Sequence, residues 1–243
     1  MVPHARLTRR ASVSDHGPVH HRVPALLVAL LTALAGLAVV APLETADAVS
    51  ATQVHVRLRT AIKQLPVRAE RPAGYDRDEF KHWVDADGDC HDTRDEVLAA
   101  ESRSGVNAGC DVLTGSWFSY YDRVTWTQAS DVDIDHLVPL KEAWDSGAGR
   151  WTSETRERYA NDLGDRRTLV AVTDNVNQSK SDRDPAEWLP TFGRCVYLAQ
   201  WTAVKTRWSL SVDQAEKDTL TTLSKQCSNR WLSVSRAPIT SSS

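Results

Sequence analysis

The residues best suited to chemistry are an acid and a histidine that end one short apolar segment. Residues 133–140 read DIDHLVPL and place Asp135 directly before His136. The alternation of polar and apolar residues predicts a short strand. Pro139 cannot donate a ladder hydrogen bond and forces Val138 into an extended conformation. We therefore expect Asp135 and His136 near a strand end or bend, where other side chains can converge on one site.

A second polar group follows another apolar segment. Residues 168–182 read TLVAVTDNVNQSKSD, which predicts a strand leading into a helix start. Antiparallel pairing of the two strands would bring Asn177 to Asp135 and His136. Carboxylate and amide oxygens suit Mg²⁺ or Mn²⁺, a neutral histidine can take a proton from water, and Lys180 could meet a phosphate. This set predicts metal-assisted hydrolysis of a phosphodiester.

These motifs resemble the HNH nuclease motif of the ββα-metal fold. The nearer similarity is to exported bacterial HNH proteins related to the C-terminal domain of GmrSD-type restriction endonucleases. It extends to DADGDCHDTRDEVL, EAWDSGA, YANDL and DPAEWLP, and it covers about residues 70–230. The resemblance implies an α+β fold with a ββα-metal (HNH) core and additional helices.

The resemblance also implies a role for each site residue. His136 matches the general base, and Asp135 and Asn177 match metal ligands. Asn161 of YANDL matches the residue that holds the connecting loop, although its spacing to Asn177 is longer than in compact HNH motifs. Asparagine at the last position favours Mg²⁺ over zinc or nickel. The implied products carry 5′-phosphate and 3′-hydroxyl ends.

The N-terminal segment has the features of a secretory signal. Four arginines precede an apolar run over residues 23–43, and an A-x-A pattern ends at Ala48. This order is typical of a signal peptide over residues 1–48, cleaved after Ala48, and it predicts a secreted protein without stable membrane association. The apolar run is also near the length that spans a bilayer, so an uncleaved N-terminal anchor is the alternative.

Export makes the four cysteines interpretable as disulfides. The chain has no C-x-x-C pair, which argues against a zinc knuckle. Three pairings are possible, and we favour Cys90–Cys110 and Cys195–Cys227 because each closes a short loop. The α+β domain is therefore expected to be stapled by disulfides.

The rest of the chain is expected to surround this core. We expect an N-terminal helix and linker over residues 49–69, the nuclease domain over residues 70–230 and a disordered tail over residues 231–243. Helices are predicted at about residues 92–100, 194–207 and 213–226 from their spacing and caps, with another helix start at Asp184.

Two further considerations bear on the partner. The net charge is −3, so any surface that binds nucleic acid, with DNA favoured, must be local. Asp85, Asp87, Asp89 and Glu96 occupy positions of a calcium loop, but Cys90 stands where that loop needs glycine. The rival hypothesis is a non-catalytic exported calcium-binding or cell-surface module. A modification-dependent restriction nuclease is a third, and the leader argues against it.

Overall fold

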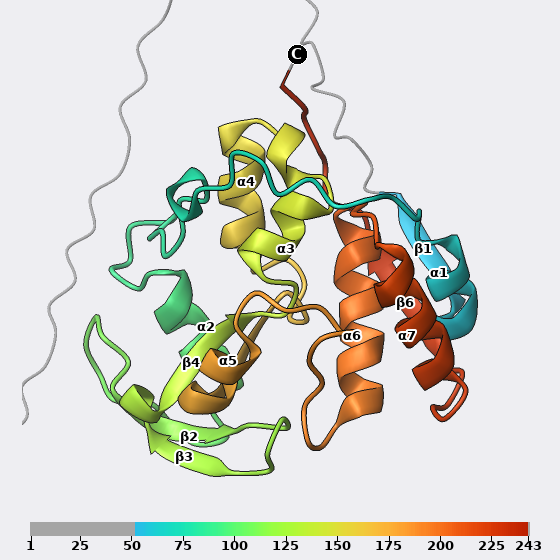
Figure 1. Cartoon of the computed structure of the whole chain (residues 1–243). Coiled ribbons are helices and arrows are strands. Elements are labelled where there is room, and N and C mark those ends of the chain that lie inside the picture. The colour runs from blue at the N-terminus through green and yellow to red at the C-terminus, as the bar shows by residue number, and fades with distance from the viewer. Residues whose placement is uncertain (1–51, 243) are drawn as a thin grey trace, which may run out of the picture. The chain divides into compact units, whose positions relative to one another are not determined.

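The computed structural model describes residues 52–242, and over this range the chain is a mixed α+β protein (Figure 1). The strands are β1 (Gln53–Arg57), β2 (Thr114–Phe118), β3 (Thr125–Gln128), β4 (Val132–His136), β5 (Leu169–Thr173) and β6 (Trp231–Ser235). The helices are α1 (Leu58–Gln64), α2 (Thr93–Glu101), α3 (Leu140–Asp145), α4 (Ser153–Ala160), α5 (Asp174–Lys180), α6 (Arg194–Arg207) and α7 (Gln214–Ser224). The predicted signal peptide and its predicted cleavage site after Ala48 lie outside the described residues.

The strand pair β4–β5 carries both polar groups that the sequence singles out. The strands are antiparallel, and Asp135 lies opposite Val170 while His136 lies opposite Leu169. Helix α5 begins directly after β5 and packs over this pair (Figure 1). The predicted strand, strand and helix start are therefore confirmed. Strand β4 ends at His136, before the bend that Pro139 imposes.

The two faces of β4–β5 pack into different apolar clusters, because successive residues of a strand point to opposite faces. Val132 and Ile134 belong to a small cluster with residues of α2 and β2. Val170 and Val172, which lie opposite Asp135 and Asp133, belong to the main core. This arrangement fixes the register, since a slip of one residue would bury the wrong face.

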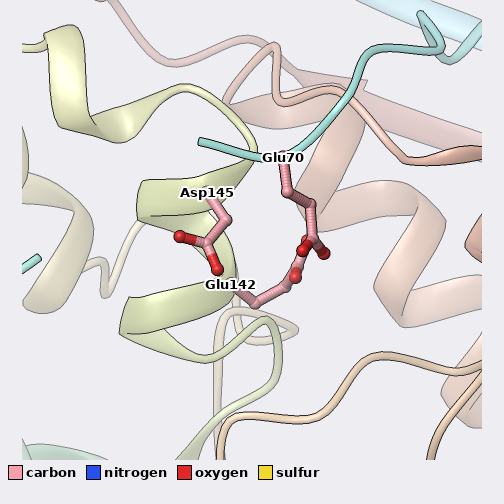
Figure 2. Close-up of side chains that lie close together, drawn as sticks. All are labelled: Glu70, Glu142 and Asp145. Atoms are coloured by element: carbon pink, nitrogen blue, oxygen red, sulfur yellow. The ribbon is translucent and has the colours of Figure 1, made fainter. Parts of the chain in front are cut away.

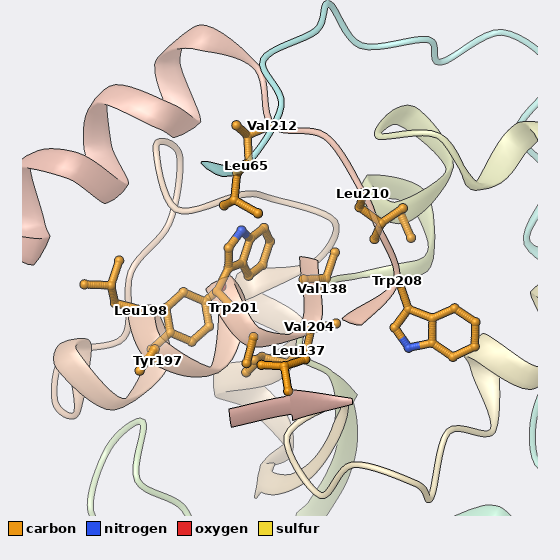
Figure 3. Packing of buried hydrophobic residues seen from close by; sticks show 14 of the residues in the cluster. Leu65, Leu137, Val138, Tyr197, Leu198, Trp201, Val204, Trp208, Leu210 and Val212 are labelled. Atoms are coloured by element: carbon orange, nitrogen blue, oxygen red, sulfur yellow. The ribbon is translucent and has the colours of Figure 1, made fainter. Parts of the chain in front are cut away.

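The main core surrounds α6 and extends to the end of β4. Figure 3 shows Trp201 and Val204 of α6 packed near Leu137 and Val138, which directly follow His136. Leu137 and Val138 are both fully buried. Burial of an aliphatic side chain contributes about 1.5–3 kcal/mol, so the residues after His136 anchor the strand end firmly.

Both ends of the described chain differ from the sequence-based prediction. Residues 49–69 were expected to form a helix, but β1 precedes the short α1. Residues 231–243 were expected to be disordered, but they include β6, which pairs with β1. Alternation explains β6, because Leu232 and Val234 are buried between exposed neighbours. The two ends form one sheet, and β6 also packs against α6, so these segments are part of the folded structure.

The disulfide pairing predicted from sequence proximity is confirmed. Cys90 is bonded to Cys110, and Cys195 to Cys227.

The helix expected at Asp184 is only a turn, although the Asp184 side chain accepts backbone hydrogen bonds as an N-cap does. Among the helices of residues 52–242, none is long and apolar enough to cross a membrane.

Candidate active site

His136 ends β4 in a buried environment that fixes its protonation. Its Nε2 atom lies 2.9 Å from the carbonyl oxygen of Ala160. A carbonyl oxygen only accepts, so Nε2 carries the proton and donates it, and Nδ1 keeps the free lone pair. Burial lowers the pKa of His136 to about 3, against the opposing effect of the Ala160 hydrogen bond. The ring is therefore neutral at ordinary pH, and Nδ1 offers a lone pair.

Aromatic side chains hold the His136 ring in place. The ring of Trp83 lies 5.5 Å from it and that of Tyr159 lies 6.4 Å from it, between centroids. The Tyr159 hydroxyl donates to the carbonyl oxygen of Val138. The strand end, the bend that follows it and α4 are thus joined around the imidazole. Such rigid support keeps a proton acceptor in one orientation.

Asp135 is buried beside His136, and both of its carboxylate oxygens have a partner. Oδ1 lies 2.6 Å from Nζ of Lys180, and Oδ2 accepts a hydrogen bond of 2.6 Å from the Tyr121 hydroxyl. Burial raises the pKa of Asp135, while Lys180 and Tyr121 oppose that rise. A carboxylate offers about four lone-pair sites, so each oxygen retains capacity for a further ligand.

Asn177 lies on α5 and contacts the same strand, β4. Its Nδ2 atom donates to Oδ2 of Asp133 over 3.2 Å. Because the amide nitrogen is held in this way, Oδ1 is the atom left to accept from another group. Asp133 therefore orients Asn177.

A cleft of about 380 Å³ brings the predicted residues together. Asp135, His136 and Asn177 all line it, with Ser181 and Asp182 at the end of α5. Neighbouring strand residues point to opposite faces, yet Asp135 and His136 share the cleft because β4 ends there. Their adjacency thus lets a carboxylate and an imidazole approach one bound group from different sides.

Lys180 does not take the position that its sequence suggested. A phosphate contact was expected, but the side chain is fully buried and does not line the cleft. Its Nζ atom contacts Asp135 and also donates to the carbonyl oxygen of His136 over 3.1 Å. Burial lowers the pKa of Lys180, and the carboxylate of Asp135 opposes that effect. Lys180 therefore positions Asp135 instead of meeting solvent.

Asn161 lies at the end of α4, outside the cleft, and its side chain makes four hydrogen bonds. Its Nδ2 donates to the carbonyl oxygens of Lys81 and Glu157, both over 2.8 Å. Its Oδ1 accepts from the backbone of Val84 over 3.1 Å and from Thr93 over 2.9 Å. These bonds tie residues 81–93 to α4. Because Ala160 precedes Asn161, the same junction supports the carbonyl that orients His136.

Arg77 is a residue of the cleft that sequence reasoning missed. It is exposed, lines the cleft and begins a 3₁₀ turn, Arg77–Glu79. Arg156 of α4 anchors that turn through Glu79, with 2.5 Å between Nη2 and Oε2. A guanidinium suits phosphate recognition. The sequence signal was weak, since a single arginine in a polar loop is commonly solvated.

The donors of the cleft fit a hard divalent cation. A carboxylate, an amide oxygen and room for water match the usual surroundings of Mg²⁺, which binds few protein oxygens and keeps several waters.

The carboxylates of Asp85, Asp87 and Asp89 form a separate exposed group with ligand atoms within 4.8 Å of one another, and Glu96 is outside it. These carboxylates accept hydrogen bonds from backbone amides of the same loop. For example, the Gly88 amide donates to Oδ1 of Asp85 over 2.7 Å.

Two antiparallel strands, the helix that follows them and a histidine at the strand end are the arrangement expected of an HNH-type nuclease domain. The chain belongs to the family of GmrSD restriction endonucleases, C-terminal domain, whose model matches residues 92–223. It is also 43% identical over 204 residues to an uncharacterized secreted protein of Arthroderma benhamiae, covering 82% of this chain and 98% of that protein. No solved structure matches the chain.

Proposed function

We propose that this protein is a secreted, metal-dependent endonuclease that hydrolyses phosphodiester bonds of nucleic acid, with DNA favoured and little sequence preference. The observation that carries the proposal is the state of His136. Its Nε2 proton is committed to Ala160, and Nδ1 is free in a cleft shared with Asp135 and Asn177. The family match supports nuclease chemistry at this cleft.

The chain's own groups have separate tasks in this proposal. His136 accepts the proton of the attacking water through Nδ1. Asp135 and Asn177 hold a Mg²⁺ or Mn²⁺ ion through carboxylate and amide oxygens. When bound, such an ion polarises the scissile phosphate and stabilises the charge on the leaving oxygen. Asn161 and Lys180 support the geometry, one behind His136 and the other behind Asp135.

Arg77 replaces Lys180 as the proposed phosphate contact. It is an exposed cation of the cleft, whereas Lys180 has no exposed surface. The net charge of −3 makes such a local contact important, because the chain as a whole does not attract nucleic acid.

The direct test is cleavage by the purified protein. Supercoiled plasmid and RNA are each incubated with Mg²⁺, Mn²⁺ or Ca²⁺, with and without EDTA. We expect Mg²⁺-dependent nicking of plasmid that EDTA abolishes. His136→Ala should lower the rate by about 10²- to 10⁴-fold, as for a lost general base, while leaving the fold intact. His55→Ala is the matched control, since His55 is an exposed residue of β1.

The metal ligands should behave differently from the base. Asp135→Ala and Asn177→Ala should weaken Mn²⁺ binding measured by calorimetry, and excess metal should restore part of their activity. His136→Ala should bind Mn²⁺ nearly as the parent protein does. Cleavage by His136→Ala at the parent rate would contradict the assignment of His136 as the base. Absence of cleavage by the parent protein with every metal would instead favour the calcium-binding or cell-surface module.

Secretion is supported by two observations. The matching relative is named a secreted protein, and two disulfides close loops in residues 52–242. Disulfides persist in oxidising compartments. Mass spectrometry of culture supernatant should find a mature chain that begins after Ala48.

A further inference from the structure

We propose that Glu70, Glu142 and Asp145 form a binding site for a calcium ion, separate from the candidate active site. Each side chain offers one carboxylate oxygen, and these oxygens all lie within 4.8 Å of one another. Figure 2 shows the three side chains converging from α3 and from the extended segment that carries Glu70. Glu142 and Asp145 are only 4% and 5% exposed.

An unsatisfied oxygen in this group points to a missing ligand. Oδ1 of Asp145 is buried and has no hydrogen-bond partner among the described residues. A buried polar atom without a partner is costly, and native structures rarely leave one in that state. A cation bound among the three carboxylates would satisfy it.

The nearby lysines pair with the two buried carboxylates, so the charge left uncompensated in this group is that of Glu70. Lys205 contacts Glu142 and Glu216 together, and it also donates to Ser146 and Ser211. Lys141 pairs with the other oxygen of Asp145, Oδ2, over 2.5 Å.

Glu70 has no ion pair within residues 52–242. Partial burial raises its pKa, and the carboxylates of Glu142 and Asp145 raise it further. Repulsion of this kind is relieved when a divalent cation binds.

The arrangement favours calcium over other cations. The ligand atoms are all carboxylate oxygens, which suit hard cations and not zinc or copper. Calcium binds oxygen at 2.3–2.6 Å, so two of its ligands can be almost 5 Å apart, whereas Mg²⁺ needs a tighter octahedron. An adjoining hollow of about 570 Å³ leaves room for water to complete the coordination.

The site lies directly behind the candidate active site. Gln178, Ser181 and Asp182 line both the cleft at His136 and the hollow beside Glu70. Helix α3, which carries two of the proposed ligands, begins immediately after Pro139. A bound calcium ion would therefore join the Glu70 segment to α3 and steady the helix that follows the DIDHLVPL segment.

Calorimetric titration of the purified protein with CaCl₂ alone tests the proposal. We expect a dissociation constant of roughly 10⁻⁴–10⁻³ M, the range of extracellular calcium sites. Glu70→Gln and Asp145→Asn should each weaken binding by about tenfold or more, because the charge of the ligands sets the affinity. Glu70 is exposed, so Glu70→Gln is expected to fold normally. Calcium should also raise the thermal unfolding midpoint of the parent protein but not of Glu70→Gln.

Asp85→Asn is the matched control, because it removes one charge from the exposed acidic loop instead. It should leave this calcium binding unchanged. The proposal is overturned if Glu70→Gln and Asp145→Asn bind calcium as the parent does, if only Asp85→Asn loses binding, or if Mg²⁺ binds there and calcium does not. None of these readouts requires cleavage, so the result is independent of the proposed nuclease activity.

Discussion

The buried pair of Lys180 and Asp135 supports the candidate site at the scale of single residues. Both side chains are almost completely buried, 2.6 Å apart. Removing one partner of such a pair leaves the other charge unpaired in the interior and typically costs about 3–5 kcal/mol. Lys180→Met should therefore lower the free energy of unfolding by about that amount, measured by urea denaturation.

The double variant Lys180→Met/Asp135→Asn distinguishes loss of the pair from loss of packing. Asparagine carries no charge, so the double variant should recover much of the stability that the single variant loses. It should remain inactive, because the proposed metal ligand is gone. No recovery in the double variant would mean that Lys180 acts through packing of its side chain alone.

These residues also mark the limit of prediction from sequence. Asp135, His136 and Asn177 were predictable because strand pairing places them together whatever surrounds them. The role of Lys180 was not predictable, because its spacing after Asn177 does not say whether its side chain points into the core. Arg77 lines the cleft from a turn that Arg156 anchors, and these residues lie far apart in the sequence.

Glu101 gives a residue-scale prediction about pH. It ends α2, and its Oε2 accepts from the backbone of Ala171 over 3.0 Å. Burial raises the pKa of Glu101 from 4.5 to about 7, against the opposing effects of Ala171 and Arg166. The folded state therefore binds the proton more tightly than the unfolded state. The resulting stabilisation is full below about pH 4.5 and is lost as the pH rises through about 7.

Glu101→Gln should remove this pH dependence while keeping a side-chain oxygen for Ala171. Relative to the parent protein, the variant should gain on the order of 1–3 kcal/mol in the free energy of unfolding between pH 5 and pH 8. Urea denaturation at the two pH values measures the difference. A parallel pH dependence in both proteins would show that Glu101 is ionised in the folded state.

At the scale of elements, the sheet β1–β6 is the feature that the sequence did not predict. Val54 and Leu58 are spaced as in a helix, but the first lies in β1 and the second begins α1. Strand β6 is short and polar on one face, so its composition resembles that of a tail. Its partner lies at the opposite end of the described chain, and periodicity within one segment carries no information about such pairing.

The element-scale prediction is that β6 contributes to stability. Leu232 is 5% exposed and belongs to the main core. Leu232→Ala should lower the free energy of unfolding by about 2–5 kcal/mol, the usual range for a buried leucine. Ser233→Ala on the same strand should change it by less than about 0.5 kcal/mol, because Ser233 faces solvent. If neither variant changed the free energy of unfolding, the disordered tail expected from the sequence would be favoured.

At the scale of the whole molecule, each disulfide links two segments that lie 20 or 32 residues apart in the sequence. Cys195 opens α6, and Cys227 follows α7, so their bond closes the pair of helices at one end. Cys90–Cys110 closes the acidic loop before α2 onto the segment before β2. Both pairings could be predicted because proximity in sequence favours short loops. Neither bond involves a residue of the candidate site.

Loss of either disulfide should therefore lower stability without removing the chemistry. The double variant Cys195→Ser/Cys227→Ser should lose on the order of 3 kcal/mol in the free energy of unfolding, because the bond restricts the unfolded chain. The Cys90–Cys110 bond spans 20 rather than 32 residues, so Cys90→Ser/Cys110→Ser should lose slightly less by the same reasoning. Thermal and urea denaturation measure both losses.

Each variant should still nick plasmid at temperatures where it is folded, since Asp135, His136 and Asn177 are held by β4, β5 and α5. Abolished cleavage in a folded Cys90→Ser/Cys110→Ser variant would instead place the acidic loop within the active site.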